Sequence, residues 1–203
     1  LAFETNATGA IVLLKMRVPP ALDLAAIAAR CPQKKQAQEG HSLRSPQEKH
    51  LAFGPRWRVL EQTALGEDEG LARLRLPARA RDDGCLLPPG LMDMATGWAM
   101  ALIKDYAPSH LWVPVSYGSL RVYRALPDEV FSWVQNAAEN SAQSEPACFD
   151  IVVCDRSGAV CAEVRALTLR RLAQSNAFGT VAALLEETPS PDVSPMAPAM
   201  ATP

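Results

Sequence analysis

The chain has 203 residues, with 20 lysine and arginine residues against 22 aspartate and glutamate residues. Its formal net charge of −2 argues against nucleic acid or an anionic membrane as the main partner. Hydrophobic residues make up 48% of the sequence, which is enough for the core of one domain, and no apolar run is long enough to span a bilayer.

The N-terminal part combines an apolar run with a polar connection. Residues 10–18 (AIVLLKMRV) are rich in residues that favour β-structure and predict a strand. Residues 23–30 predict a short helix capped by Asp23, and residues 32–49 have the polar, Gly/Pro-punctuated composition of a loop or linker. Because Leu1 is not a methionine and no signal-peptide pattern is present, we expect a piece of a longer, cytoplasmic protein.

Strand-like runs surround one helix in the rest of the chain. Six runs show the alternating or β-branched patterns of strands: residues 57–64, 71–76, 113–124, 129–136, 148–155 and 159–171. The last two are separated by a hairpin-turn signal, Asp155-Arg156-Ser157-Gly158. Since the alternating helices of a parallel sheet are missing, the pattern predicts an α+β fold in which an antiparallel sheet wraps around a central buried helix.

That central helix carries the most informative residue of the chain. The segment LLPPGLMDMATGWAMALIK (86–104) opens with prolines, which a helix start tolerates, and is apolar almost all round. Asp93 is the one acidic residue in it. Burial would raise the pKa of a carboxyl in such a setting and make it a proton donor near neutral pH. The alternative is an acid that only complements the dipole of the helix N-terminus.

Three motifs in order give the chain a family resemblance. They are FGPRW (53–57), LPPGLMDMATG (87–97) and VPVSYGSLRVY (113–123). Over roughly residues 18–172 they resemble the "YGPxF", "HPxLLDxxxQ" and "LPFSWxGVRL" motifs of polyketide synthase dehydratase domains, specifically the C-terminal half of their double hotdog fold. The resemblance implies a lyase of secondary metabolite biosynthesis, acting on a β-hydroxyacyl thioester carried by an acyl carrier protein.

The resemblance also implies a division of the chain. Residues 1–17 are then the end of a preceding segment or a first strand, and residues 18–52 a linker with a short helix. Residues 53–172 are the hotdog domain, and residues 173–203 a C-terminal linker or disordered tail. The Pro/Ser/Ala/Met-rich composition from Thr188 onward favours mobility of that tail.

Site residues follow from the same motifs. The resemblance makes Asp93 the acid that protonates the leaving hydroxyl. It places six substrate-binding residues around it: Gly90, Thr96, Gly97, Phe53, Trp57 and Tyr117. Water loss next to a thioester needs an acid, a base and an oxyanion donor, so we expect no metal, nucleotide or flavin cofactor beyond the phosphopantetheine of the carrier. The implied partners are neighbouring synthase domains, including an N-terminal hotdog half, and a second copy of the chain in a homodimer.

The chain departs from the family pattern in three places. The "HxxxGxxxxP" motif of the family's catalytic histidine is missing, and His41, His50 and His110 lack its context. Gly97 stands where the family often has a Gln or His one turn after the aspartate, and Pro88 stands where the family usually has His. These departures leave two alternatives open: a non-catalytic structural module of a megasynthase, or a double-bond isomerase or oxa-Michael cyclase on the same fold.

Five cysteines and four arginines carry further expectations. Cys31, Cys85, Cys148, Cys154 and Cys161 are odd in number and show no metal-binding spacing, so we expect free, mostly buried thiols in a reducing compartment. A nucleophilic cysteine is the alternative, which no basic surrounding supports.

Four arginines have two possible roles. They can attract an acidic carrier protein, or they are ordinary solvated side chains. These residues are Arg56, Arg58, Arg121 and Arg124.

Overall fold

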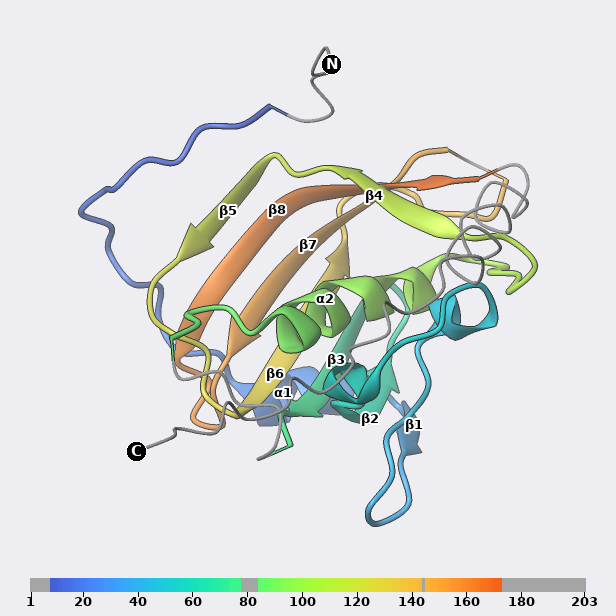
Figure 1. The fold of residues 1–203 in the computed structure, drawn as a ribbon, viewed down its shortest axis with the longest axis horizontal. Coiled ribbons are helices and arrows are strands. Elements are labelled where there is room, and N and C mark those ends of the chain that lie inside the picture. The colour runs from blue at the N-terminus through green and yellow to red at the C-terminus, as the bar shows by residue number, and fades with distance from the viewer. Residues whose placement is uncertain (1–7, 78–83, 144, 173–203) are drawn as a thin grey trace, which may run out of the picture.

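The computed structural model of the chain describes residues 8–77, 84–143 and 145–172. The predicted C-terminal linker or tail at 173–203, with the stretch from Thr188 onward that is expected to be mobile, lies outside the described residues. The described chain forms one antiparallel sheet in the order β1-β2-β3-β6-β7-β8-β4, with β5 also paired to β8 (Figure 1). Its strands are β1 Gln33–Gln36, β2 Leu60–Leu65, β3 Glu69–Arg75, β4 Trp112–Ser116, β5 Ser119–Val122, β6 Glu129–Asn136, β7 Ala147–Cys154 and β8 Val160–Arg171.

The central helix crosses the inner face of this sheet. The α-helix α2 runs from Pro89 to Gly97 and continues as a 3₁₀ helix, η4, over Trp98–Leu102. Trp98 is 1% exposed and Met100 is fully buried. The predicted buried helix within an antiparallel sheet is therefore confirmed, with its last turn tightened to 3₁₀ geometry.

Trp98 fastens the helix to the sheet. Its Nε1 donates to Ser132 Oγ on β6 at 3.1 Å, and Ser132 Oγ in turn donates to the carbonyl of Ala95 at 2.6 Å. On the neighbouring strand, a Cβ at Gly70 would lie 2.7 Å from the Trp98 ring. The glycine thus lets the indole lie directly on β3, while the buried polar atoms all find partners.

The outer face of the sheet carries the short helix α1, Leu24–Arg30 (Figure 1). Because successive side chains of a strand point to opposite faces of the sheet, one sheet packs against both helices. On β3, Ala72 and Leu74 belong to the core around α2, whereas Leu71 packs with Ile27 and Cys31 of the α1 region. The predicted cap of α1 is present, because the Asp23 carboxylate accepts from the backbone N–H of Ala26 at 2.9 Å.

Two N-terminal expectations were wrong. Residues 10–18 form no strand, and Ile11 and Leu13 are 100% and 98% exposed. Apolar, β-favouring composition does not make a strand unless another edge accepts its hydrogen bonds. Conversely, β1 lies within the polar stretch expected to be a loop, where it pairs with β2 from Gln33↔Leu65 to Gln36↔Gln62.

The expected strand at 113–124 is divided into β4 and β5. The register on β8 shifts between Pro114 and Ser116. Gly118 then crosses β8 closely, since a Cβ there would lie 3.0 Å from the Cβ of Ala166. Ala166 itself has a positive φ of 51°, which bends β8 at the same point.

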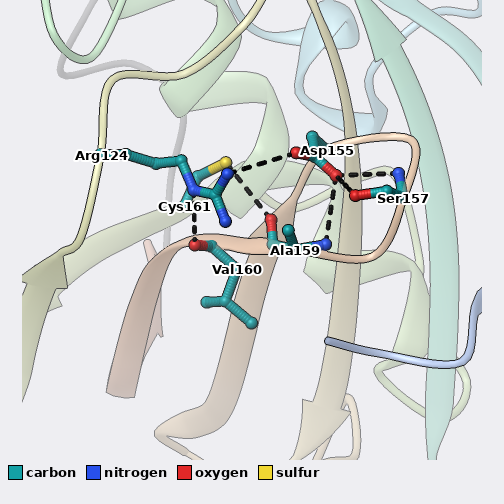
Figure 2. A network of polar contacts seen from close by, with 6 residues as sticks. All are labelled: Arg124, Asp155, Ser157, Ala159, Val160 and Cys161. Atoms are coloured by element: carbon teal, nitrogen blue, oxygen red, sulfur yellow. Dashed lines mark hydrogen bonds and ion pairs between the residues drawn. The ribbon is translucent and has the colours of Figure 1, made fainter. Parts of the chain in front are cut away.

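The predicted hairpin turn between β7 and β8 is confirmed. Asp155 Oδ1 accepts hydrogen bonds from Ser157 N at 2.8 Å, Ser157 Oγ at 2.6 Å and Ala159 N at 3.1 Å (Figure 2). Arg124 approaches Asp155 Oδ2 at 3.5 Å and donates to the carbonyl of Val160 at 3.2 Å. Gly158 takes the positive φ of 81° that the turn requires.

Asp155→Ala is expected to lower the free energy of unfolding by about 1–2 kcal/mol, because the turn loses an acceptor shared by three donors. The Ser157 hydroxyl holds the pKa of Asp155 below its ordinary value of 3.8. The carboxylate therefore stabilises the fold above that pH, and the contribution disappears as pH falls through the lowered pKa.

Urea titrations of the wild type and of Asp155→Ala at pH 7 and pH 3 test this prediction. Asp155→Asn, which keeps the Oδ1 acceptor, is the matched control. An equal loss in Asp155→Asn, or a difference that grows toward pH 3, would contradict the account.

Candidate active site

The FGPRW motif folds against the start of α2. Gly54 and Pro55 begin a short 3₁₀ helix, η2, over Pro55–Trp57. The Trp57 ring stacks on Phe53 with an interplanar angle of 7°, and its Nε1 donates to Asp93 Oδ2 at 2.6 Å. The motif therefore contributes a hydrogen bond that fixes one oxygen of the helix aspartate.

Gly90 has a packing role that the sequence did not indicate. A Cβ at this position would lie 2.3 Å from the carbonyl oxygen of Arg56. Only a glycine lets the first turn of α2 approach η2 so closely. This contact sets the relative position of Trp57 and Asp93.

A cavity of about 410 Å³ opens beside Asp93. Four of the predicted site residues line it: Asp93, Thr96, Gly97 and Tyr117. Its other walls are Gln47, Leu87, Pro89, Met92, Pro114, Leu120, Leu167 and Leu169. Phe53, Trp57 and Gly90 are not part of the lining, although Trp57 contacts the aspartate. The result is a mostly apolar chamber with one carboxylate on its wall, the kind of surface that suits an acyl chain.

The surroundings of Asp93 differ from the expectation in two respects. Its side chain is exposed, so the full burial that the apolar sequence of the helix predicted is not seen. The Thr96 hydroxyl is occupied within the helix, donating to the carbonyl oxygens of Met92 and Asp93 at 3.1 Å each. Trp57, and not Thr96, is therefore the side chain that holds the carboxylate.

None of the three histidines lines this cavity. His50 Nε2 contacts the carbonyl of Pro108 at 2.9 Å, and His110 Nδ1 contacts the hydroxyl of Ser109 at 3.1 Å. His41 Nδ1 lies 3.1 Å from the carbonyl of Glu39. In the described part of the chain, no histidine lines the chamber that contains Asp93.

Gln47 is a polar cavity residue that the sequence did not reveal. It lies in the 3₁₀ helix η1, Pro46–Lys49, and is only 7% exposed. Its Nε2 donates to the carbonyl of Trp112 at 3.4 Å. It falls in the polar stretch read as a loop or linker, where nothing in the local pattern signals burial of one glutamine.

The five cysteines are free, and the three buried ones are unsuited to nucleophilic attack. Cys31, Cys154 and Cys161 are buried. Burial raises the pKa of Cys154 to about 12 and also raises the pKa values of Cys31 and Cys161. Among the described residues, no group of three or more His, Cys, Asp or Glu side chains is placed to hold a metal ion.

Two of the four arginines form ion pairs with described residues. Arg58 is paired with Glu48, and Arg124 with Asp155.

Within the described ranges, no helix combines the length and hydropathy needed to cross a membrane.

Comparison with known families decides the family of the chain. Residues 19–178 match the family model described as "Polyketide synthase dehydratase N-terminal domain". The chain belongs to the polyketide synthase dehydratase family. The resemblance read from the three motifs is therefore confirmed at the level of the family. The description of the matching model names the N-terminal domain, whereas the motifs predict the C-terminal half.

Known synthases and solved dehydratases are similar over most of the chain. Polyketide synthase PksM of Bacillus subtilis (strain 168) is 25% identical over 129 residues, which cover 60% of this chain and 3% of PksM. A trans-AT dehydratase domain from Brevibacillus brevis is 26% identical with a TM-score of 0.60, covering 77% of this chain and 55% of its own. The CurJ dehydratase of the curacin synthase is 24% identical with a TM-score of 0.62, covering 76% and 55%.

These likenesses confirm the predicted fold class, an α+β hotdog fold with its sheet around a central helix. The chain spans about half the length of the solved dehydratase chains and a small part of the curated synthases that it matches.

Proposed function

We propose that this chain is the aspartate-bearing half of a dehydratase that removes water from a β-hydroxyacyl thioester. Asp93 is the acid in this proposal. The substrate is an acyl chain on the phosphopantetheine of an acyl carrier protein, and no further cofactor takes part. The enzyme works within a cytoplasmic polyketide synthase.

The observation that carries the proposal is the placement of Asp93 on the wall of an acyl-sized chamber. The carboxylate lies in a cavity of about 410 Å³ whose other walls are mostly apolar. Trp57 holds Oδ2, and within the described residues no donor is bonded to Oδ1. One carboxyl oxygen is thus fixed while the other is available to a substrate hydroxyl.

The chemistry needs one further group. A base removes the proton next to the thioester carbonyl, the C–O bond at the β-carbon breaks, and Asp93 gives its proton to the departing hydroxyl, which leaves as water. No histidine in the described part of this chain lines the chamber, so the base must come from elsewhere. The solved dehydratases are nearly twice as long as the matched region, which is room for a second hotdog half.

Three features support the C-terminal half as the assignment. The FGPRW motif, the aspartate helix that it contacts and the β4–β5 connection that bears Tyr117 occur in the order of that half. The rim of the chamber also exposes large apolar side chains, with Tyr117 55% and Leu120 46% exposed. Such a rim suits coverage by the other half, which would bring the histidine opposite Asp93.

The isolated chain is expected not to dehydrate a β-hydroxyacyl pantetheine thioester, whereas the intact protein that contains it is expected to be active. The reason is the missing base. Both are assayed by the appearance of the conjugated enoyl thioester. Turnover by the isolated chain that disappears in His50→Ala or His110→Ala would show that the base is internal. An inactive intact protein would favour a structural module of the synthase.

A further inference from the structure

A buried glutamine shares the chamber with Asp93. Gln47 is 7% exposed, and its side-chain amide is a strongly polar group whose burial costs free energy unless its atoms find partners. Its Nε2 donates to the carbonyl of Trp112. Within the described residues, no donor is bonded to its Oε1. An acceptor on the wall of an apolar chamber therefore remains open.

The amide lies directly over Gly97. A Cβ built at Gly97 would be 3.3 Å from Gln47 Oε1 and 3.8 Å from its Cδ. Gly97 is four residues after Asp93, which is about one helical turn and the same face of α2. Gln47 thus fills, from a different segment, the space into which a side chain at position 97 would extend beside the aspartate.

The segment around Gln47 is built to hold it there. Ser45 and Glu48 form a capping box, in which Ser45 Oγ accepts from the N–H of Gln47 at 3.3 Å and Glu48 accepts from the N–H of Ser45 at 2.9 Å. Glu48 is also paired with Arg58, next to η2. The glutamine backbone is therefore tied to the same region that positions Trp57.

The leaving hydroxyl requires such an acceptor. When Asp93 donates its proton to the hydroxyl oxygen, the hydrogen of that hydroxyl must point to another acceptor, because an unsatisfied polar group in an apolar chamber is costly. An amide oxygen meets this need and, unlike a carboxylate, does not compete for the transferred proton.

We propose that Gln47 is a substrate-binding residue whose Oε1 accepts the hydrogen of the β-hydroxyl and orients the hydroxyl oxygen toward Asp93. The inference rests on the proposed dehydratase function. It assigns to η1 the polar group that the helix itself lacks at Gly97. It also explains a buried glutamine in a mostly apolar lining.

The first test is Gln47→Met in the intact protein, with Gln47→Ala alongside. Methionine keeps the volume and removes the acceptor. We expect a fall in kcat of about tenfold to a hundredfold with KM changed less, because the hydrogen bond matters most as the hydroxyl departs. The melting temperature of Gln47→Met should stay close to that of the wild type. A kcat within twofold of the wild type would overturn the proposal.

The second test moves the amide to the helix. Gly97 has helical dihedral angles, φ −68° and ψ −27°, so a glutamine there is unstrained. In the Gln47→Ala background, Gly97→Gln should recover most of the lost kcat, since the freed space accepts the new side chain. In the wild-type background, Gly97→Gln should lower activity, because both side chains then compete for one site.

A merely structural role for Gln47 makes different predictions. It would give a loss in Gln47→Ala that tracks a lowered melting temperature and that Gly97→Gln does not restore, and this result would overturn the proposal. Asp93→Asn, measured in parallel, distinguishes a failure of the proposed role of Gln47 from a failure of the proposed dehydratase function. If Asp93→Asn is inactive and the Gln47 variants are normal, only this inference fails. If Asp93→Asn is fully active, the proposed function fails.

Discussion

Asp93→Asn in the intact protein is expected to lower the rate of dehydration by about a hundredfold or more, the usual scale for a lost general acid. Asparagine keeps the shape of the side chain and can still accept the hydrogen bond from Trp57 Nε1. It has no proton to give to the departing hydroxyl. Thioester dehydration and thermal melting of the same preparation measure the two consequences separately.

The alternative role for Asp93 has its own signature. A carboxylate that only complements the helix dipole would contribute roughly 1 kcal/mol or less to stability and nothing to the chemistry. Asp105→Asn is a matched control, because Asp105 is an aspartate that does not line the cavity. Unchanged turnover in Asp93→Asn would end the catalytic interpretation and favour a structural module.

Trp98→Ala is expected to lower the free energy of unfolding by about 3–5 kcal/mol, the cost of a large cavity in a core. The indole is 1% exposed, lies on Gly70 and donates to Ser132 on β6. Its removal leaves the helix without its contacts to Gly70 on β3 and Ser132 on β6. Urea denaturation followed by circular dichroism measures the change.

Trp98→Phe is the control for that variant. It keeps an aromatic ring over Gly70 and removes the N–H donor, while Ser132 Oγ still donates to the carbonyl of Ala95. The expected cost is therefore smaller, about 1–2 kcal/mol. A loss below about 1 kcal/mol in Trp98→Ala would show that the helix is held by other contacts.

Elements with a clear local pattern were predictable from the sequence. Residues 129–136 alternate between the two faces, and β6 has these bounds in the structure. The buried helix was recognisable because its apolar residues surround it. The strand β1 was not, since all four of its residues, QKKQ, are exposed and carry no hydrophobic periodicity.

The site was less accessible to sequence reasoning because its geometry is non-local. Asp93 and Trp57 were singled out separately, but the hydrogen bond between them depends on how Gly90 packs on Arg56. The break between β4 and β5 arises where Gly118 meets Ala166 on another strand. Burial of Gln47 depends on a contact with Trp112, far along the chain.

The order of strands in the sheet has a consequence for how the chain folds. Strands β3 and β6 are neighbours, with Arg75 opposite Glu129, yet α2, β4 and β5 all lie between them in the sequence. Closing this long loop makes the pairing slow, because its entropy cost comes before its contacts form. During synthesis, α2 leaves the ribosome before β6 exists. Trp98 then lacks Ser132 and the wall of the sheet behind it, so the nascent chain exposes this apolar helix at the stage when aggregation or chaperone binding competes with folding.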